Sequence, residues 1–548
     1  MSVLLRRSND IPDASTYQAW LAVSGTKAAL DPAAKLDGLA QRLEQAFVAE
    51  RDTWWRLGRA LSAEPTADIA RMPTASSFGS DFGIMLAWSR LVDELAGDND
   101  VTLVVCDDPW LFRHLMQFDG VKAAAPPPLL SATIRLQLRG LLSRCRLSFS
   151  TALAALRLKG QRRMVAPGDS MILVYGHPDS NVDGNDAYFG DLMKRLPGLK
   201  RMLHTDCPAG RATELGTSLH AWGSPLFALG AVFCQWLPSR KQTSGEYGWL
   251  IRRAASLENG GGGPAMNRWQ AHCQDRWLAL AKPSRVAWPW ENHGWERNLC
   301  RTAGALGVKT IGYQHTVIGP HQFNYATATN PDGLQSIPDI VAADGPAYRE
   351  QMREWGVPQE RLGVGGAFRF RRFADNIFDA DGPVFVPLSA IPEAAAAQLN
   401  AARIIARQGR PILVKPHPMY GINVVPEANL NLADAPLAEQ SRLSAVLYTT
   451  GTSGLEAALM GIPAYRLMLE DRIAIDVLPP SIPSYAVTPD TAADAVLRPQ
   501  SPPARVAWDD ILRDPDIDLW KSWLFGDIDA INETPPKDNQ NKKTKQAS

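Results

Sequence analysis

Short apolar runs that end in polar or small residues recur along the chain, and helical segments separate them. Examples are VTLVVCDDPW (101–110), MILVYGHPDSN (171–181) and ILVKPHP (412–418). Apolar runs without alternation are typical of strands buried on both faces, as in parallel sheets that helices cover. The alternation of such strands with helices predicts an α/β fold with two doubly wound, Rossmann-like domains that face a cleft.

The length of 548 residues favours two or three domains over one core. A turn-rich segment at 324–338 marks the expected boundary between the two Rossmann-like domains. From the N-terminus we predict a mainly helical extension (1–95), an N-terminal Rossmann-like domain (96–330), a C-terminal Rossmann-like domain (331–500), closing helices (501–530) and a disordered polar tail (531–548).

The composition argues against several classes of protein. The net charge of zero provides no global field for nucleic acid. The six cysteines are scattered, which argues against a structural zinc site and a disulfide framework and suits a reducing cytosol. The N-terminus does not resemble a signal peptide, and no apolar run is long enough to span a membrane. We therefore expect a cytoplasmic protein.

Two segments bear on membrane contact. The stretch 131–163 is basic and amphipathic, with arginines between leucines, so it could rest on the anionic inner face of the inner membrane. An ordinary pair of surface helices with a solvated basic face explains the same pattern. The apolar segment 225–238 is expected to be a buried element.

The segment LYTTGTSGLEAALMGIP (447–463) combines a strand, a hydroxyl-rich turn and a helix. The free N–H groups of the first helical turn and the hydroxyls of Thr450, Thr452 and Ser453 suit a phosphate. Glu456, one turn into the helix, could accept a ribose hydroxyl. A capped helix with glycine at a tight turn is the simpler explanation of the same residues.

A neighbouring strand ends in Lys415, Pro416 and His417. Both polar side chains would face the same anion as the hydroxyl turn. A histidine there can donate to a phosphoryl oxygen or act as the acid for a leaving phosphate. The two prolines around His417 restrict the backbone at this point.

KPHP followed by the hydroxyl turn and LEAALMGIP resembles the donor domain of bacterial GT-B glycosyltransferases of surface-polysaccharide biosynthesis. Sialyltransferase-like and Kdo-transferase-like enzymes with CMP-sugars carry such motifs, as do teichoic-acid polymerases with CDP-alditols. WPWENHGWERNLC and GYQHTVIGPHQFNY also resemble segments of bacterial surface-carbohydrate biosynthesis proteins. The resemblance covers roughly residues 283–470 and implies a GT-B fold with the acceptor bound by the N-terminal domain.

Related transferases place a carboxylate or a histidine in the N-terminal domain as the base that deprotonates the acceptor hydroxyl. Glu291 and His315 each follow a strand of that domain and are the candidates. We favour His315 as the base, because the glycines of its loop allow close backbone approach. Glu291 would then orient His315 or hold the acceptor; it could also be only an acid at a helix N-terminus.

Further donor-site residues follow from the resemblance. Gly366 and Arg369 are expected at the end of a C-terminal-domain strand, where Arg369 could clamp a phosphate or carboxylate. Leu388 and Ser389 are expected to pack on a pyrimidine base and to hydrogen-bond it through their backbone. GT-B folds leave the departing phosphate to helix termini and basic side chains, so no essential metal and no cofactor are expected.

The resemblance thus implies a glycosyltransferase that moves a sugar from a nucleotide-activated donor, CMP-linked in this case, to a surface glycan, lipid-linked glycan or protein. Capsule and lipopolysaccharide are the kinds of product expected. A CDP-alditol phosphotransferase of the teichoic-acid type, with the same anion site, is an alternative. A non-catalytic GT-B-like scaffold in polysaccharide assembly is another.

Overall fold

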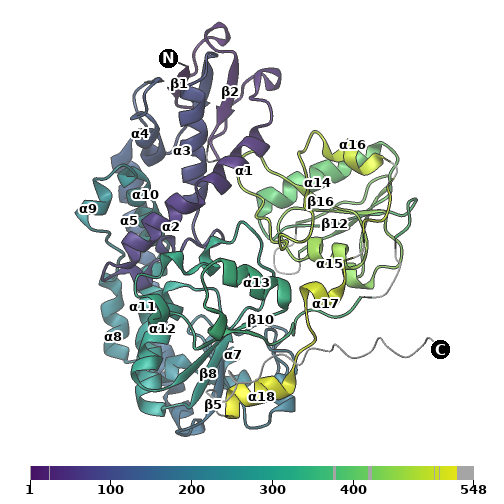
Figure 1. Cartoon of the computed structure of the whole chain (residues 1–548). Coiled ribbons are helices and arrows are strands. Elements are labelled where there is room, and N and C mark those ends of the chain that lie inside the picture. The colour runs from purple at the N-terminus through teal and green to yellow at the C-terminus, as the bar shows by residue number, and fades with distance from the viewer. Residues whose placement is uncertain are drawn as a thin grey trace, which may run out of the picture.

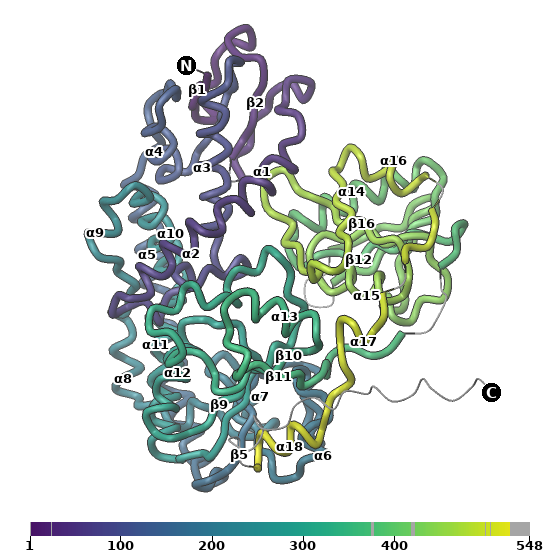
Figure 2. Tube along the Cα trace, viewed as in Figure 1, coloured from purple at the N-terminus to yellow at the C-terminus, as the bar shows by residue number. Residues whose placement is uncertain are grey.

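The computed structural model describes residues 2–23, 25–373, 378–417, 422–498, 500–504 and 506–526. The predicted tail at 531–548 lies outside these residues. Three parallel sheets organise the described chain: one of four strands, one of seven and one of six. Figures 1 and 2 show the six-stranded sheet at the right of the view, while the other two sheets and their helices form the taller part at the left. The α/β prediction is therefore confirmed, with one sheet more than expected.

The N-terminal sheet was not predicted. It contains β1 (Val3–Arg6), β2 (Ala19–Ala22), β3 (Thr102–Val105) and β4 (Val121–Ala123), in the order β2-β3-β1-β4. Residues 1–95 are thus more than a helical extension, because they contribute two strands as well as α1 (Leu39–Ala49), α2 (Arg51–Ser62) and α3 (Phe82–Ala96). The strand at 102–105 belongs to this sheet and not to the acceptor domain. Four-residue strands whose partners lie about a hundred residues away leave little local signal.

The seven-stranded sheet has the strand order of a Rossmann fold. Its order is β11-β10-β9-β8-β5-β6-β7, so chain direction across the sheet reverses between β5 and β8. The strands are β5 (Ser170–Val174), β6 (Lys200–Leu203), β7 (Thr217–Ser218), β8 (Arg285–Pro289), β9 (Lys309–Tyr313), β10 (Ile340–Ala343) and β11 (Leu362–Val364).

The predicted domain boundary near residue 330 is wrong. β10 pairs with β9, and β11 pairs with β10, so residues 340–364 remain in the seven-stranded sheet. The turn-rich segment at 324–338 is a connection within this domain, folded into three short 3₁₀ helices. Turn residues mark a connection between elements, but they do not say which sheet the next strand joins.

Helices cover both large sheets. Those of the part that holds the seven-stranded sheet are α5 (Leu129–Leu158), α6 (Leu192–Arg195), α7 (Ala209–Leu215), α8 (Pro225–Gly230), α9 (Arg240–Thr243), α10 (Gly248–Gly261), α11 (Gly263–Ala281), α12 (Gly294–Ala305) and α13 (Pro346–Glu354). α4 (Pro109–Leu115) lies between β3 and β4 in the chain and packs on α3 and α10. The core beneath them is rich in fully buried tryptophan, including Trp269, Trp277 and Trp288.

The six-stranded sheet repeats the same strand order, β14-β13-β12-β15-β16-β17, with its reversal between β12 and β15. Its strands are β12 (Val384–Pro387), β13 (Ile412–Lys415), β14 (Leu430–Leu432), β15 (Ala445–Tyr448), β16 (Ala464–Leu467) and β17 (Tyr485–Val487). Its helices are α14 (Pro392–Arg407), α15 (Ser453–Leu459) and α16 (Ala492–Leu497).

The last two helices return the chain to the seven-stranded sheet. They are α17 (Trp508–Ile511) and α18 (Ile517–Phe525). The indole N–H of Trp520 donates to the carbonyl of Gly365 at 2.9 Å, just beyond β11. An added Cβ on Gly363 would meet the ring of Trp523, so that glycine permits the close approach of α18. The two large sheets are therefore linked by two chain crossings.

A buried ion pair also joins the six-stranded sheet to the N-terminal helices. Arg466 at the end of β16 is 3% exposed and pairs with Glu44 of α1, while Asp476 lies 3.5 Å away. His321, on the loop after β9, accepts through Nδ1 from the backbone N–H of Asp476 at 3.0 Å. An added Cβ on Gly319 would lie 2.1 Å from the carbonyl oxygen of Asp476. Loops beyond the carboxyl ends of β9 and β16 thus touch directly.

Candidate active site

The strand orders of the two large sheets indicate where each sheet would bind a ligand. Ligands of doubly wound sheets bind beyond the carboxyl ends of the strands, at the point where the order reverses. In the seven-stranded sheet this point lies between the ends of β5 and β8, and Glu291 follows β8. In the six-stranded sheet it lies between β12 and β15, where Ser389 and the hydroxyl turn follow. Sequence-predicted residues therefore flank both reversal points.

The loop that carries Glu291 is held rigidly. Asn292 has φ +56° and is fully buried, and its amide donates to the carbonyls of Asn324 and Ala326 and to Asn330 Oδ1, between 2.9 and 3.2 Å. Asparagine tolerates this left-handed conformation better than most residues. The loop therefore has a fixed conformation without any ligand.

The helix-capping acid of this loop is Glu296, not Glu291. His293 is the N-cap of α12, and the carboxylate of Glu296 accepts from the backbone N–H groups of His293 and Glu291. Glu296 is 1% exposed, and burial raises its pKa to about 8, although its hydrogen bonds and His293 oppose the shift. Because Glu296 satisfies the first turn of the helix, the carboxylate of Glu291 is available for other contacts.

Glu291 lies between two histidines. Its Oε2 is 2.7 Å from His293 Nε2, and its Oε1 is 3.7 Å from His315 Nε2. Burial acts to raise the pKa of Glu291, but the hydrogen bond and charge of His293, helped by His315, outweigh it and lower the pKa to about 2. Burial lowers the pKa of His293, yet the bond to Glu291 and its charge raise it overall. At neutral pH this cluster holds a firmly ionised carboxylate.

The pKa of His315 is displaced in the opposite direction to that of His293. It is 7% exposed, and burial lowers its pKa to about 4, an effect that Glu291 offsets only in part. Its ring meets that of Tyr188 edge to face, with 5.2 Å between centroids. The guanidinium of Arg369 lies 5.8 Å from the centroid of Tyr188. His315 is therefore a neutral, enclosed imidazole, whereas the Glu291 side chain keeps 37% of its surface exposed.

Sequence reasoning missed His293. The signal was present in WPWENHGWE, because a histidine two residues after a strand-end acid, directly before a helix, can face that acid. The local pattern could not tell which of Glu291 and Glu296 caps the helix. Asp107 and Asp108, two further strand-end acids, are structural: Asp108 caps α4 and pairs with Arg253 at 2.6 Å.

Arg369 and Gly366 lie beyond β11, which places them in the seven-stranded sheet rather than in the donor domain as predicted. Gly366 has φ +85°, and an added Cβ would meet the carbonyl of Asp514, so its role is to admit the returning C-terminal segment. Arg369 is exposed and lies over Tyr188, on the side of the Glu291 cluster. The error arose because β11 and β12 are adjacent in sequence but belong to different sheets.

The hydroxyl turn after β15 leads directly into a helix, as predicted. Gly451 has φ +143°, and Ser453 opens α15, a helix of seven residues. The hydroxyl of Thr452 donates to Glu456 Oε1 at 2.9 Å. Burial raises the pKa of Glu456, and this hydrogen bond moderates the shift. Thr452 and Glu456 thus bond each other across the first turn, while Thr450 is half-buried at the turn itself.

Several polar groups at the ends of β12 and β13 already form hydrogen bonds within the protein. The ammonium of Lys415 donates to the carbonyls of Ala433 and Asp434, at 3.3 and 2.8 Å. Partial burial lowers the pKa of His417. The N–H of Leu388 donates to Lys415 O, and the N–H of Ser389 donates to Gln398 Oε1, at 2.9 and 2.8 Å. Both N–H groups are thus already bonded within the protein, while the carbonyl groups of Leu388 and Ser389 are not part of these bonds; that the backbone of these residues binds a base stays a prediction.

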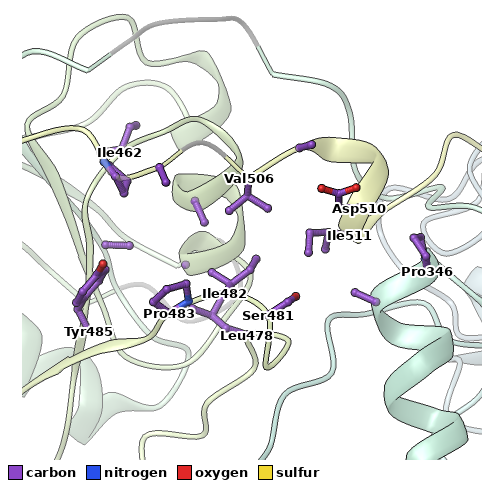
Figure 3. A pocket seen from close by; sticks show the side chains of 17 residues that line it. Pro346, Ile462, Leu478, Ser481, Ile482, Pro483, Tyr485, Val506, Asp510 and Ile511 are labelled. Carbon is purple, nitrogen blue, oxygen red and sulfur yellow. The ribbon is translucent and has the colours of Figure 1, made fainter. Parts of the chain in front are cut away.

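A separate apolar pocket with a volume of about 550 Å³ is lined by residues of α15, α13 and α17 (Figure 3). Its walls include Ile462, Leu478, Tyr485 and Ile511, with Pro346 of α13 opposite. None of the predicted site residues lines it. It is therefore distinct from both strand-end sites.

Among the described residues, no group of three His, Cys, Asp or Glu side chains could hold a metal ion. The expectation of metal independence remains a prediction. No helix in the described ranges is long and apolar enough to cross a membrane.

No family model and no curated protein matches the chain. Similar solved structures include a putative UDP-N-acetylglucosamine 2-epimerase from Listeria monocytogenes (TM-score 0.34, 11% identity, 63% of this chain and 93% of that one). The glycotransferase of kitacinnamycin has a TM-score of 0.34 and 13% identity, over 60% of this chain and 90% of that one. The glycosyltransferase SnogD from Streptomyces nogalater has a TM-score of 0.31 and 11% identity, over 61% and 94%.

At these TM-scores and identities the similarities carry no argument by themselves. The two Rossmann strand orders and the C-terminal helices that return to the first large sheet define the fold within the chain itself. The chain has a GT-B-like fold, extended by a small N-terminal sheet. The structure does not identify a sialyltransferase or Kdo-transferase subtype.

Proposed function

We propose that the protein is a metal-independent glycosyltransferase that transfers a sugar from a nucleotide-activated donor, CMP-linked, to a surface glycan, lipid-linked glycan or protein. One observation carries the proposal: an ionised carboxylate between two histidines follows β8, at the reversal point of the first large sheet. A hydroxyl turn follows β15, at the corresponding point of the second.

In the proposed reaction, the acceptor oxygen attacks the anomeric carbon as the bond from that carbon to the donor phosphate breaks. Glu291 takes the hydroxyl proton at Oε1, because Oε2 is engaged by His293. We assign this role to Glu291 rather than to His315, since His315 is enclosed and the Glu291 side chain is 37% exposed. His293 and His315 would be positioning residues that fix the carboxylate.

The donor phosphate would lie between the two sheets. Lys415, His417 and the hydroxyls of Thr450, Thr452 and Ser453 would face it from the C-terminal side. Arg369 would reach it from the opposite side, as a clamp from the acceptor-binding domain. Partial burial lowers the pKa of His417 and so favours the neutral ring, which would donate a hydrogen bond through one ring nitrogen. The charge of the leaving group would be stabilised by these preplaced donors.

A direct test is to incubate purified protein with CMP-, CDP-, UDP- and GDP-linked donors and to measure both thermal stabilisation and transfer. A donor at a hundred times its Kd should stabilise the protein by about 2.7 kcal/mol. We expect the CMP-linked donor to give the largest effect, and His417→Ala to remove transfer while preserving the circular dichroism spectrum. His417→Gln, which retains a hydrogen-bond donor, is the matched control and should keep part of the activity.

The possible outcomes separate the alternatives. Release of CMP with an alditol phosphate transferred from a CDP-linked donor would identify a phosphotransferase. Stabilisation by a nucleotide without any transfer or hydrolysis would indicate a scaffold. Conversion of a UDP-sugar without acceptor would point to epimerase chemistry instead of transfer.

A further inference from the structure

We propose that one face of the N-terminal half docks on an anionic lipid bilayer. The α5–α8 face is formed by the exposed side of α5, by α8 and by the 3₁₀ turn Ala231–Phe233 that follows it. These elements pack on each other, and Arg144 of α5 donates from Nε to the carbonyl of Val232 at 2.8 Å. In Figure 1 they lie at the left edge, on the opposite side from the six-stranded sheet.

The exposed side of α5 is apolar along its whole length. Leu130, Leu142 and Phe149 are 73%, 72% and 75% exposed, and Ile134, Leu138 and Leu156 are also exposed. At 3.6 residues per turn these six positions fall within a sector of about 120°. Leu136, Arg144 and Ala155, which pack inward, fall outside this sector. A continuous apolar stripe on a helix of about 45 Å is much more than the scattered leucines of an ordinary surface.

The segment after α7 extends this surface. Residues 225–238 were expected to be buried, but Leu226 and Phe233 are 82% and 87% exposed, and Leu237 is 66% exposed. The prediction is wrong because Ala228, Ala231 and Trp236 make the inward contacts, so the larger apolar residues between them point outward. Two neighbouring elements thus present apolar side chains to solvent.

The charges beside the apolar stripe indicate what kind of partner binds there. Arg135, Arg146 and Arg157 are exposed and fall within about 60° of its edge on the helical wheel. The sequence has no Asp or Glu from residue 120 to 168, nor from 215 to 245. In the described part of the chain, none of these three arginines forms an ion pair with a carboxylate. Leucine and phenylalanine flanked by unpaired arginine, on an acid-free surface, match the interface of an anionic bilayer.

The test is flotation with vesicles of phosphatidylcholine alone and with a quarter of phosphatidylglycerol. The full chain should float with the anionic vesicles at low salt, and binding should fall at high salt because screening weakens the arginine contribution. Leu226→Ser with Phe233→Ser should lower binding by about tenfold or more, since two apolar anchors are lost. The matched control is Leu306→Ser with Leu432→Ser, two exposed leucines elsewhere.

A second pair tests the charges. Arg146→Glu with Arg157→Glu should lower binding to anionic vesicles by about tenfold or more at low salt. Arg349→Glu with Arg407→Glu makes the same change in net charge on exposed positions of α13 and α14, and should leave most binding intact. Circular dichroism and the melting temperature of each variant establish that it is folded.

Three results would overturn the proposal. One is wild-type protein that stays lipid-free at low salt. The second is equal binding by wild type and both face variants. The third is a dimer in sedimentation velocity, without vesicle binding, that the Leu226→Ser/Phe233→Ser variant dissociates; it would assign the face to a second copy of the chain. Binding is measured without substrate, so the result is independent of the proposed transfer reaction.

Discussion

The two large sheets have the same strand order but different chemistry at their carboxyl edges. The edge of the seven-stranded sheet brings together ionisable groups with displaced pKa values: the pKa of Glu291 is lowered to about 2 and that of His315 to about 4, whereas the pKa of His293 is raised. The edge of the six-stranded sheet carries hydroxyls, a positive-φ glycine and a lysine that bonds backbone carbonyls. Shared topology therefore fixes where a site lies, and the loops decide what it does.

This contrast suggests a division of labour. Displaced pKa values concentrate where proton transfer or charge stabilisation is needed. Donors fixed by turns and short helices suit the binding of a phosphate, which requires no titration. We expect changes at the first edge to affect turnover and changes at the second to affect donor affinity.

The largest effect is expected from Glu291→Gln. The amide preserves shape but cannot accept the acceptor proton, so kcat should fall by about 10²–10⁴-fold, while the apparent affinity for donor changes little. Initial rates with varied donor and acceptor measure this. Glu350→Gln, a change at an exposed acid of α13 that pairs with Arg353, is the control. Full activity of Glu291→Gln together with inactive His315→Ala would return the role of base to His315.

We expect a smaller effect, on stability, from changes where the N-terminal helices contact the six-stranded sheet. Glu44→Ala leaves Arg466 buried with only part of its partners, and we expect a loss of about 2–3 kcal/mol because an uncompensated buried charge is costly. Glu470→Ala removes a more exposed pair with Lys35 across the same contact and should cost at most about 1 kcal/mol. Denaturant unfolding compares them; equal losses would mean that burial of the pair does not matter.

The smallest effect is the pH dependence of the Glu291–His293 pair. The lowered pKa of Glu291 stabilises the fold above its ordinary value of 4.5, and this contribution disappears as pH falls toward 2. The raised pKa of His293 stabilises the fold below its ordinary value of 6.5, and this contribution disappears as pH rises through the folded-state pKa. Both act together between about pH 4.5 and 6.5.

The difference in melting temperature between wild type and Glu291→Gln should therefore be largest in that interval. Because the Glu291 side chain is partly exposed, the difference should correspond to at most about 1 kcal/mol. Thermal unfolding across a pH series measures it. A difference that stays constant from acid to alkaline pH would exclude the ion pair as its source.

The sequence by itself determined the α/β class, and it predicted that Glu291, His315 and the hydroxyl turn follow the ends of strands. These are local properties: a buried strand is an apolar run, and the residues that follow it lie at the sheet edge whatever the rest of the chain does. The same reasoning identified the amphipathic character of 131–163, because helical periodicity is visible within a few turns.

The tertiary structure alone decided which sheet each strand joins and which polar groups meet. β11 and β12 are neighbours in sequence, yet they lie in different sheets, and this moved Arg369 from the donor side to the side of Glu291. Glu296 took the capping role and left Glu291 to the two histidines, which no spacing rule distinguishes. Exposure of Leu226 and Phe233 depended equally on what packs around them. Such outcomes rest on contacts between segments far apart in the chain, so local patterns cannot specify them.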